Sequence, residues 1–182
     1  MVKHGLLGLW VVGLLCTSNV AFAQWPEGVT VVKSEKGKSV SAKGKMEDGK
    51  PIEDLTWAAN SSMACFPATQ NEKFRGNHVM FATDLPPKSI MTVTVVPDDP
   101  KQDLSIWGYS VGTDNFRTPP GIPSCVACEA EHKWDRPKRG KTQDHTRTIT
   151  FNAIGNPYNV LIGVSGPKGA TAGGFTLKVD LK

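Results

Sequence analysis

The sequence predicts an all-β fold, an antiparallel β-sandwich of jelly-roll-like type, from three observations. Short segments after Phe74 alternate apolar residues with Thr, Ser or charged residues, which is the period-two pattern of a strand with one buried face. Gly, Pro, Asn and Asp separate these segments, as turns between antiparallel strands require. No helical period is found between Phe74 and Lys182. Strands that are apolar on one face bury it by stacking two sheets.

Six strands are expected in this region. The clearest is IMTVTVV, in which apolar residues alternate with Thr between a Pro-Pro turn and a Pro-Asp-Asp-Pro turn. A long polar loop with two cysteines separates the third expected strand from the fourth. In chain order the expected strands are residues 78–82, 90–96, 104–111, 147–151, 159–164 and 174–181.

The first residues have the composition of an export signal. Lys3 and His4 precede an apolar run, and Ala21-Phe22-Ala23 is an A-x-A cleavage site before Gln24. The run is roughly half of the ~20 residues that span a bilayer. We therefore expect a cleaved signal peptide and a secreted or periplasmic protein without a transmembrane segment in the mature chain; a retained N-terminal anchor is the alternative. The expected division is a signal peptide at 1–23, an N-terminal extension or linker at 24–66 and the β-sandwich domain at 67–182.

The N-terminal extension is expected to be short and irregular. Residues 33–50 are rich in Lys, Gly and Ser, which suggests a solvated linker or a weak hairpin with a turn at Asp48-Gly49. Residues 51–66 fit neither the helical nor the strand period and are left unassigned.

The net charge of the chain is +4, and the signal peptide accounts for one of these charges. Dedicated nucleic-acid binders concentrate far more positive charge on one face. The sequence therefore predicts no nucleic-acid partner.

Three cysteines remain after removal of the leader, and two of them form Cys125-x-x-Cys128. Covalent haem attachment needs His directly after the second cysteine, but Glu129 stands there, so the sequence argues against haem. A redox pair needs a helix N-terminus, and no helix is expected in this region, so the sequence also argues against a redox centre. Because exported cysteines usually pair, we expect a disulfide from Cys65 to Cys125 or Cys128, with a local Cys125–Cys128 bridge second. Zinc bound by a Cys₃His set is the weaker alternative. That set would be Cys65, Cys125, Cys128 and His132.

Two further groups of residues are candidate sites. The polar loop after Cys128 offers a ligand-binding set, and within it Asp144 and His145 could form an acid–base pair. Three carboxylates around the turn after residue 97 could bind calcium, although Asp is also an ordinary turn residue. The ligand-binding set is Trp134, Arg136, Arg139, Asp144 and His145. The calcium candidates are Asp98, Asp99 and Asp103. No cofactor is expected, with zinc or calcium as the alternative.

Trp107 and Tyr109 lie two residues apart on one expected strand and so share a face. They are expected in the core. The alternative is an exposed aromatic strip that recognises a glycan or a protein.

Five segments in order carry a family resemblance, among them F-R-G-N-H-V-M-F at 74–81, T-V-T-V-V-P-D-D at 92–99 and G-G-F-T-L-K-V at 173–179. Residues from about 74 to 182 resemble the bacterial pre-peptidase C-terminal domain. The resemblance implies a β-sandwich module of a secreted protein, of a kind usually found beside proteases. The family is not associated with a C-x-x-C loop.

The sequence favours an exported, non-enzymatic β-sandwich module for accessory or binding functions. Its partner would be an extracellular protein or a polysaccharide, or a secreted protein that it assists. No catalytic residue is assigned. The alternative is a small secreted metal-dependent enzyme, such as a hydrolase, that uses His132, Asp144 and His145. A structural envelope component is a third interpretation.

Overall fold

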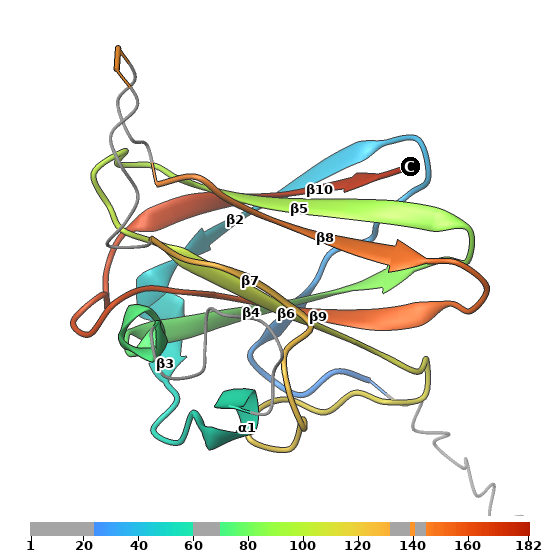
Figure 1. Ribbon diagram of the computed structural model, residues 1–182, viewed down its shortest axis with the longest axis horizontal. Coiled ribbons are helices and arrows are strands. Elements are labelled where there is room, and N and C mark those ends of the chain that lie inside the picture. The colour runs from blue at the N-terminus through green and yellow to red at the C-terminus, as the bar shows by residue number, and fades with distance from the viewer. Residues whose placement is uncertain (1–23, 60–69, 132–138, 141–144) are drawn as a thin grey trace, which may run out of the picture.

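Two β-sheets face each other in the structure, a computed structural model that describes residues 24–59, 70–131, 139–140 and 145–182. The two layers are visible in Figure 1. In chain order the strands are β1 (Val29–Val31), β2 (Ser39–Lys45), β3 (Lys50–Pro51), β4 (Asn77–Leu85), β5 (Ser89–Pro97), β6 (Ser105–Val111), β7 (Ala127–Glu129), β8 (Arg147–Ala153), β9 (Tyr158–Ser165) and β10 (Gly174–Leu181). The short helices are η1 (Met46–Asp48), α1 (Thr56–Ala59) and η2 (Asn71–Phe74).

One sheet has the strand order β1-β4-β9-β6-β7, with β3 paired to β4, and the other has the order β2-β10-β5-β8. The pairs are antiparallel except for β1 with β4, which run parallel. The expected all-β sandwich is confirmed. All six strands expected after Phe74 are present.

The main core fills the space between the two sheets. On β10, Phe175, Leu177 and Val179 are fully buried, whereas Lys178 between them is exposed. Strand β5 alternates in the same way, with Met91, Val93 and Val95 turned inward. Because successive side chains of a strand point to opposite faces, one alternating sequence makes one buried face and one solvated face.

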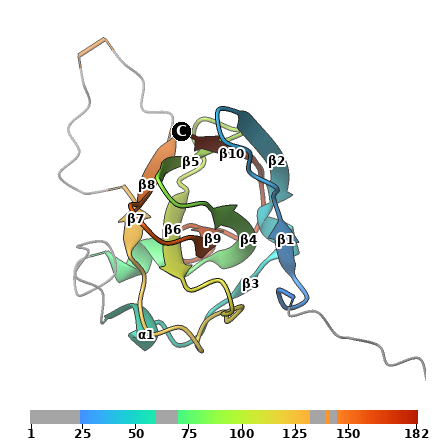
Figure 2. The same ribbon diagram turned by 90° about the vertical axis from the view of Figure 1, so that its right-hand side faces the viewer.

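A second apolar cluster covers the outer face of the β4-β9-β6 sheet. Figure 2 shows α1 on this side, away from the β2-β10-β5-β8 sheet. Since β9 is buried on both faces, its apolar run is continuous: Ile162 faces the main core and Leu161 faces the second cluster. The buried members of the second cluster are Leu55, Trp57, Ala58, Phe74, Trp107, Ile122, Cys125, Ala130 and Leu161.

Trp107 lies at the centre of the second cluster and is fully buried. Its ring packs on Gly163 of β9, where an added Cβ would lie 2.0 Å from Cε2 of the indole. Tyr109, two residues later, is half-buried against the same cluster. The pair is therefore part of a packed layer, and the exposed aromatic strip considered from the sequence is not formed.

The expectation of an irregular N-terminal extension is wrong for its strand-forming parts. Strand β2 pairs with β10 along its length, and β1 and β3 pair with β4. The inward positions of β2 are Val40, Ala42 and Gly44, and Gly44 faces the ring of Phe175, where an added Cβ would lie 2.4 Å from it. Because the inward residues of β2 include Ala and Gly, the strand shows few large apolar residues in its sequence. Its lysines made it resemble a linker.

The expectation of a loop throughout the C-x-x-C region also needs correction. Residues 127–129 form β7, which pairs with β6 and places Cys128 opposite Trp107. A strand of three residues is too short for its period to be recognised. The predicted signal peptide, residues 1–23, lies outside the described residues. None of the helices in the described part of the chain is long and apolar enough to cross a membrane.

Candidate functional site

Part of the predicted site lies outside the described residues. Trp134, Arg136 and Asp144 of the ligand-binding set fall there, as do Cys65 and His132. The zinc set, the disulfide and the Asp144–His145 pair therefore stay predictions. Of the remaining residues, Arg139 is exposed, Cys125 is buried in the second cluster and Cys128 is half-buried on β7.

The three candidate calcium ligands have different partners. Asp98 forms an exposed ion pair with Lys43, with 3.2 Å between Oδ1 and Nζ. Asp99 accepts a hydrogen bond from the backbone N–H of Lys101 at 2.9 Å, an ordinary turn contact. Asp103 alone points into a cluster of charged side chains. The turn therefore does not bring the three carboxylates together as one ligand set.

We call this cluster the charged clamp; it consists of Lys73, Asp103, Glu131, His145 and Arg147. Nζ of Lys73 lies 3.0 Å from Oδ2 of Asp103 and 3.5 Å from Oε2 of Glu131. Nη2 of Arg147 lies 3.5 Å from Oδ1 of Asp103. Nδ1 of His145 lies 3.5 Å from the same Oδ1 and 3.9 Å from Oε2 of Glu131. The clamp thus joins η2, the β5–β6 turn, the end of β7 and the start of β8.

Arg147 is the most buried member of the clamp, with 7% of its side chain exposed. Its Nε donates to the carbonyl of Leu104 at 3.0 Å, and its Nη2 lies 3.2 Å from Nδ1 of His145, which accepts when the imidazole is neutral. Burial by itself lowers the pKa of Lys73, but the hydrogen bonds and charges of Asp103 and Glu131 outweigh it and raise that pKa. Lys73 is therefore held in its charged form.

Asp103, Glu131 and His145 have the chemistry of a divalent-metal site, and their ligand atoms lie within 4.8 Å of one another. However, the ammonium of Lys73 contacts both carboxylates, and the guanidinium of Arg147 contacts Asp103 and His145. Two cations therefore balance two anions, and a metal ion would have to displace Lys73. Among the described residues the arrangement is an ion-pair network, in which Oδ1 of Asp103 is buried without a hydrogen-bond partner.

The clamp joins the two ends of the polar loop. Glu131 is the last described residue before the gap at 132–138, and His145 is the first after the gap at 141–144. His145 has a left-handed backbone (φ 53°), a conformation in which His is several-fold enriched among non-glycine residues. The sequence analysis named His145 and Asp103 as candidates for other roles, His145 in a pair with Asp144 and Asp103 as a calcium ligand. It missed Lys73, Glu131 and Arg147, because no local pattern connects residues so far apart in the chain.

Helix η2 is anchored from the inside by Phe74, which is fully buried. Nε2 of His78 on β4 donates to the Phe74 carbonyl at 2.8 Å, and Nδ1 accepts from Nε1 of Trp107 at 3.0 Å. Burial lowers the pKa of His78 to about 4, so its ring is neutral near pH 7. Both ring nitrogens are used in holding η2 and Trp107. This histidine is therefore structural.

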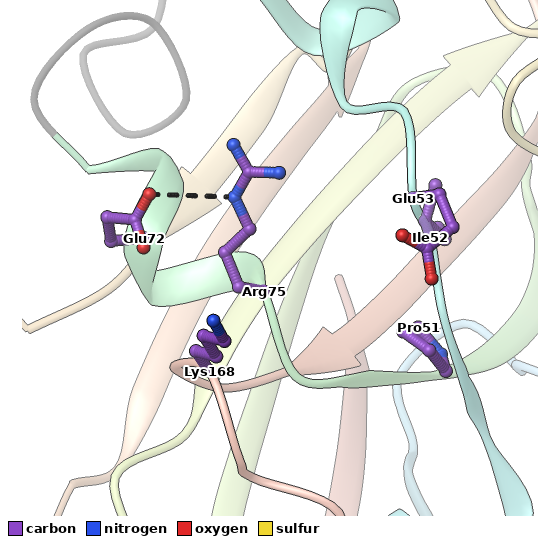
Figure 3. Close-up of a pocket in the computed structure, with 6 residues that line it drawn as sticks. All are labelled: Pro51, Ile52, Glu53, Glu72, Arg75 and Lys168. Carbon is purple, nitrogen blue, oxygen red and sulfur yellow. Dashed lines mark ion pairs between the residues drawn. The ribbon is translucent and has the colours of Figure 1, made fainter.

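A pocket lies on the outer side of η2, and we call it the η2 pocket (Figure 3). Arg75 and Glu72 line one wall, where Nε of Arg75 lies 3.6 Å from Oε1 of Glu72. Glu53 lies on the opposite wall in Figure 3. The six lining residues are Pro51, Ile52, Glu53, Glu72, Arg75 and Lys168. The pocket thus presents two cations and two carboxylates beside an apolar edge.

The loop that carries Lys168 is tied to the start of β4 by its backbone. The N–H of Gly76 donates to the Gly166 carbonyl at 2.9 Å, and the N–H of Asn77 donates to the Ala170 carbonyl at 3.0 Å. A Cβ at Gly76 would lie 2.7 Å from the carbonyl oxygen of Ala170, so the two backbones are in direct contact. The loop that carries Lys168 and the segment that carries Arg75 are therefore held together through their backbones.

No protein-family model matches the chain, and no curated protein matches its sequence. Solved structures of similar fold include PliG of Aeromonas hydrophila, a periplasmic inhibitor of g-type lysozyme, at 12% identity and a TM-score of 0.42 over 85% of this chain and 97% of that one. The pre-peptidase C-terminal domain of a collagenase from Bacillus anthracis is also similar, at 9% identity and a TM-score of 0.39 over 88% of this chain and 100% of that one.

A third similar structure is CorA of Methylomicrobium album BG8, a surface-associated copper-binding protein, at 11% identity and a TM-score of 0.43 over 85% of this chain and 98% of that one. The family that the sequence resembles is thus represented among the similar structures. At such identities and TM-scores, the likeness concerns the fold alone.

Proposed function

We propose that this chain is an exported, non-enzymatic β-sandwich module that binds a protein. The observation that carries the proposal is the η2 pocket, in which Glu72 of the well-anchored helix η2 and Arg75 directly after it lie beside charged residues of two other segments. Mixed charges on a preorganised support suit the polar rim of a protein interface. The main core is closely packed with apolar side chains, so recognition belongs to the surface.

A protein target is favoured over a polysaccharide by the positions of the aromatic rings. Sugar-binding sites present flat aromatic faces to solvent, but Trp57, Phe74 and Trp107 are buried. Within the described part of the chain, the large exposed apolar side chains are Val31, Ile90, Val126 and Ile154, none of them aromatic. Four other aromatic side chains of the described residues, Trp25, Tyr109, Phe116 and Tyr158, are half-buried, so none of the described aromatic rings is fully exposed for a sugar to stack on.

The contacts of His78 argue against a catalytic role for this histidine. Both ring nitrogens of His78 are used inside the second cluster, and Nδ1 of His145 lies within hydrogen-bonding distance of Arg147 in the clamp. A general base needs a nitrogen that reaches a substrate proton, and His78 has no nitrogen left for that role, whereas the contacts of His145 involve Nδ1.

Export is part of the proposal and is tested on the protein purified from its source organism. We expect mass spectrometry to find Gln24 as the N-terminal residue, because residues 21–23 form the A-x-A site. Recovery of intact peptides from residues 1–23 in the released protein would contradict export by cleavage.

The binding function is tested with residues 24–182 as immobilised bait for secreted proteins of the source organism, followed by chemical cross-linking. A captured protein is then purified, and its affinity for the bait is measured by calorimetry. Saturable one-to-one binding supports the proposal. Failure of every purified candidate to bind, or hydrolytic turnover that His145→Ala abolishes, would overturn it.

A further inference from the structure

We infer that the η2 pocket binds a carboxylate of the partner protein. This carboxylate belongs to an acidic side chain that has a basic residue beside it. This inference rests on the proposed function and names the chemistry of the contact. Arg75 and Lys168 would hold the carboxylate, and Glu53 would face the neighbouring cation. The inference follows from the charges of the pocket, their contacts and the support beneath them.

The cations of the pocket are only partly used within the protein. Nε of Arg75 pairs with Glu72 at 3.6 Å, whereas among the described residues neither Nη of Arg75 nor Nζ of Lys168 has a hydrogen-bond or ion-pair partner. A guanidinium held at Nε keeps its two Nη donors for a ligand, and this fork matches the two oxygens of a carboxylate. The Lys168 ammonium adds a point charge to the same pocket.

The acidic side chains of the pocket restrict which anions can bind. Glu53 and Glu72 line it together with the two cations, so its formal charge is balanced. A polyanion such as a nucleic acid or a sulfated polysaccharide would bring several negative charges against these two carboxylates. A ligand with one carboxylate and one neighbouring cation would place its carboxylate against the cations of the pocket and its cation against the carboxylates of the pocket. This pattern is characteristic of a protein surface.

The support of the pocket is built for a fixed geometry. Phe74 fixes η2 in the second cluster, Lys73 ties it to Asp103, and the Gly76–Gly166 hydrogen bond fixes the loop of Lys168. Groups held in place before binding lose less conformational entropy when the ligand arrives. The backbones that carry Arg75 and Lys168 are therefore held in place before a ligand arrives.

The first test uses three acetylated, amidated peptides: alternating Glu-Lys, all-Glu and all-Lys. In NMR titrations, we expect the Glu-Lys peptide to shift the backbone amides of Gly76, Gly166 and Gly169, and the all-Lys peptide to leave them unchanged. In Glu53→Gln the preference should move towards the all-Glu peptide, since a repulsive charge is removed. Absence of shifts at these amides with the Glu-Lys peptide would contradict the inference.

The second test compares two double variants that lose the same charge. Arg75→Gln/Lys168→Gln should weaken peptide binding by about tenfold or more, as expected for lost charge-assisted hydrogen bonds. The control is Arg117→Gln/Lys178→Gln, whose residues are exposed and are not among those that line the pocket. The control should bind like the wild type. Equal weakening of both variants would show general electrostatic attraction and overturn the inference.

Binding measurements with the partner protein captured by the bait distinguish the protein-binding proposal from the pocket inference. If this partner binds the wild type and the Arg75→Gln/Lys168→Gln variant equally well, the pocket inference fails and the binding function stands. If the Glu-Lys peptide binds in the pocket but no purified partner does, the protein-binding proposal fails and the carboxylate site stands.

Discussion

Among single residues, His78 shows how burial sets both structure and pH dependence. The residue is 2% exposed, and its ring is hydrogen-bonded to the Phe74 carbonyl and the Trp107 indole. Protonation would place an N–H at Nδ1 against the N–H of the indole, since the neutral Nδ1 is the acceptor. The histidine that anchors η2 is thus also the residue that acid disrupts.

We predict a loss of stability between pH 6.5 and about pH 4. The pKa of folded His78, about 4, is lower than the ordinary value of 6.5. In that window the unfolded chain binds a proton that the folded chain does not, so the free energy of unfolding falls as pH falls, by about 3 kcal/mol in all. Urea titrations of the wild type and His78→Asn at pH 7 and pH 4 measure the difference. An equal pH effect in both proteins would contradict the prediction.

Gly163 makes room for the Trp107 ring. A Cβ would approach the ring atoms Cε2 and Nε1 at 2.0 and 2.2 Å. The indole is wedged in the second cluster and donates to His78, so it cannot retreat without loss of that bond.

Gly163→Ala should therefore lower the free energy of unfolding by about 2 kcal/mol, the usual cost of overpacking. The matched control is Gly155→Ala in the β8–β9 turn, because a Cβ there meets nothing within 4 Å. Thermal and urea unfolding measure both variants. A loss in Gly155→Ala as large as that in Gly163→Ala would refute the explanation by contact with Trp107.

At the scale of elements, the charged clamp connects η2 to the start of β8 through Asp103, and Glu131 after β7 joins it through Lys73 and His145. The side chain of Asp103 is 19% exposed and contacts Lys73, His145 and Arg147. Asp98, in the same turn, is 53% exposed and contacts Lys43. Exposed ion pairs contribute little, whereas loss of one partner from a buried network leaves the other charges uncompensated.

Asp103→Ala should thus cost about 2 kcal/mol of stability, and Asp98→Ala less than about 1 kcal/mol. Both variants remove one negative charge from the β5–β6 turn, so the difference reports the local partners. Urea unfolding at neutral pH is the measurement. Equal losses would mean that the clamp contributes no more than a surface ion pair.

For the whole molecule, the predicted disulfide would connect the region before η2 to the β7 region. Cys125 packs in the second cluster beside residues of α1, and β7 carries Cys128. Cys65, the predicted partner, lies outside the described residues. A bridge from it to either cysteine would close a loop of about sixty residues.

We predict that loss of this bridge, in Cys65→Ser, lowers stability by about 4 kcal/mol according to the chain-entropy estimate. Peptide mapping under non-reducing conditions should find Cys65 joined to Cys125 or Cys128. Thiol titration of the unfolded, unreduced protein should find one thiol in the mature chain. Three titratable thiols would contradict the pairing.

The strands of the sandwich were predictable because their apolar residues are large and alternate over many positions. Strand β5 shows this clearly, with Met91, Val93 and Val95 inside. Strand β2 was missed because Gly44 occupies an inward position under Phe175. Its assignment depends on a ring that lies more than a hundred residues later in the sequence.

The sequence by itself determined the fold class and most strand ranges, because the period of a strand is a local property. Only the tertiary structure decided that Asp103 meets Lys73 and His145, and that Arg75 and Lys168 share a pocket. These residues lie in turns and short helices, where no period indicates the direction of a side chain. Their neighbours depend on the order of strands in the sheets, which brings distant segments to the same end of the molecule.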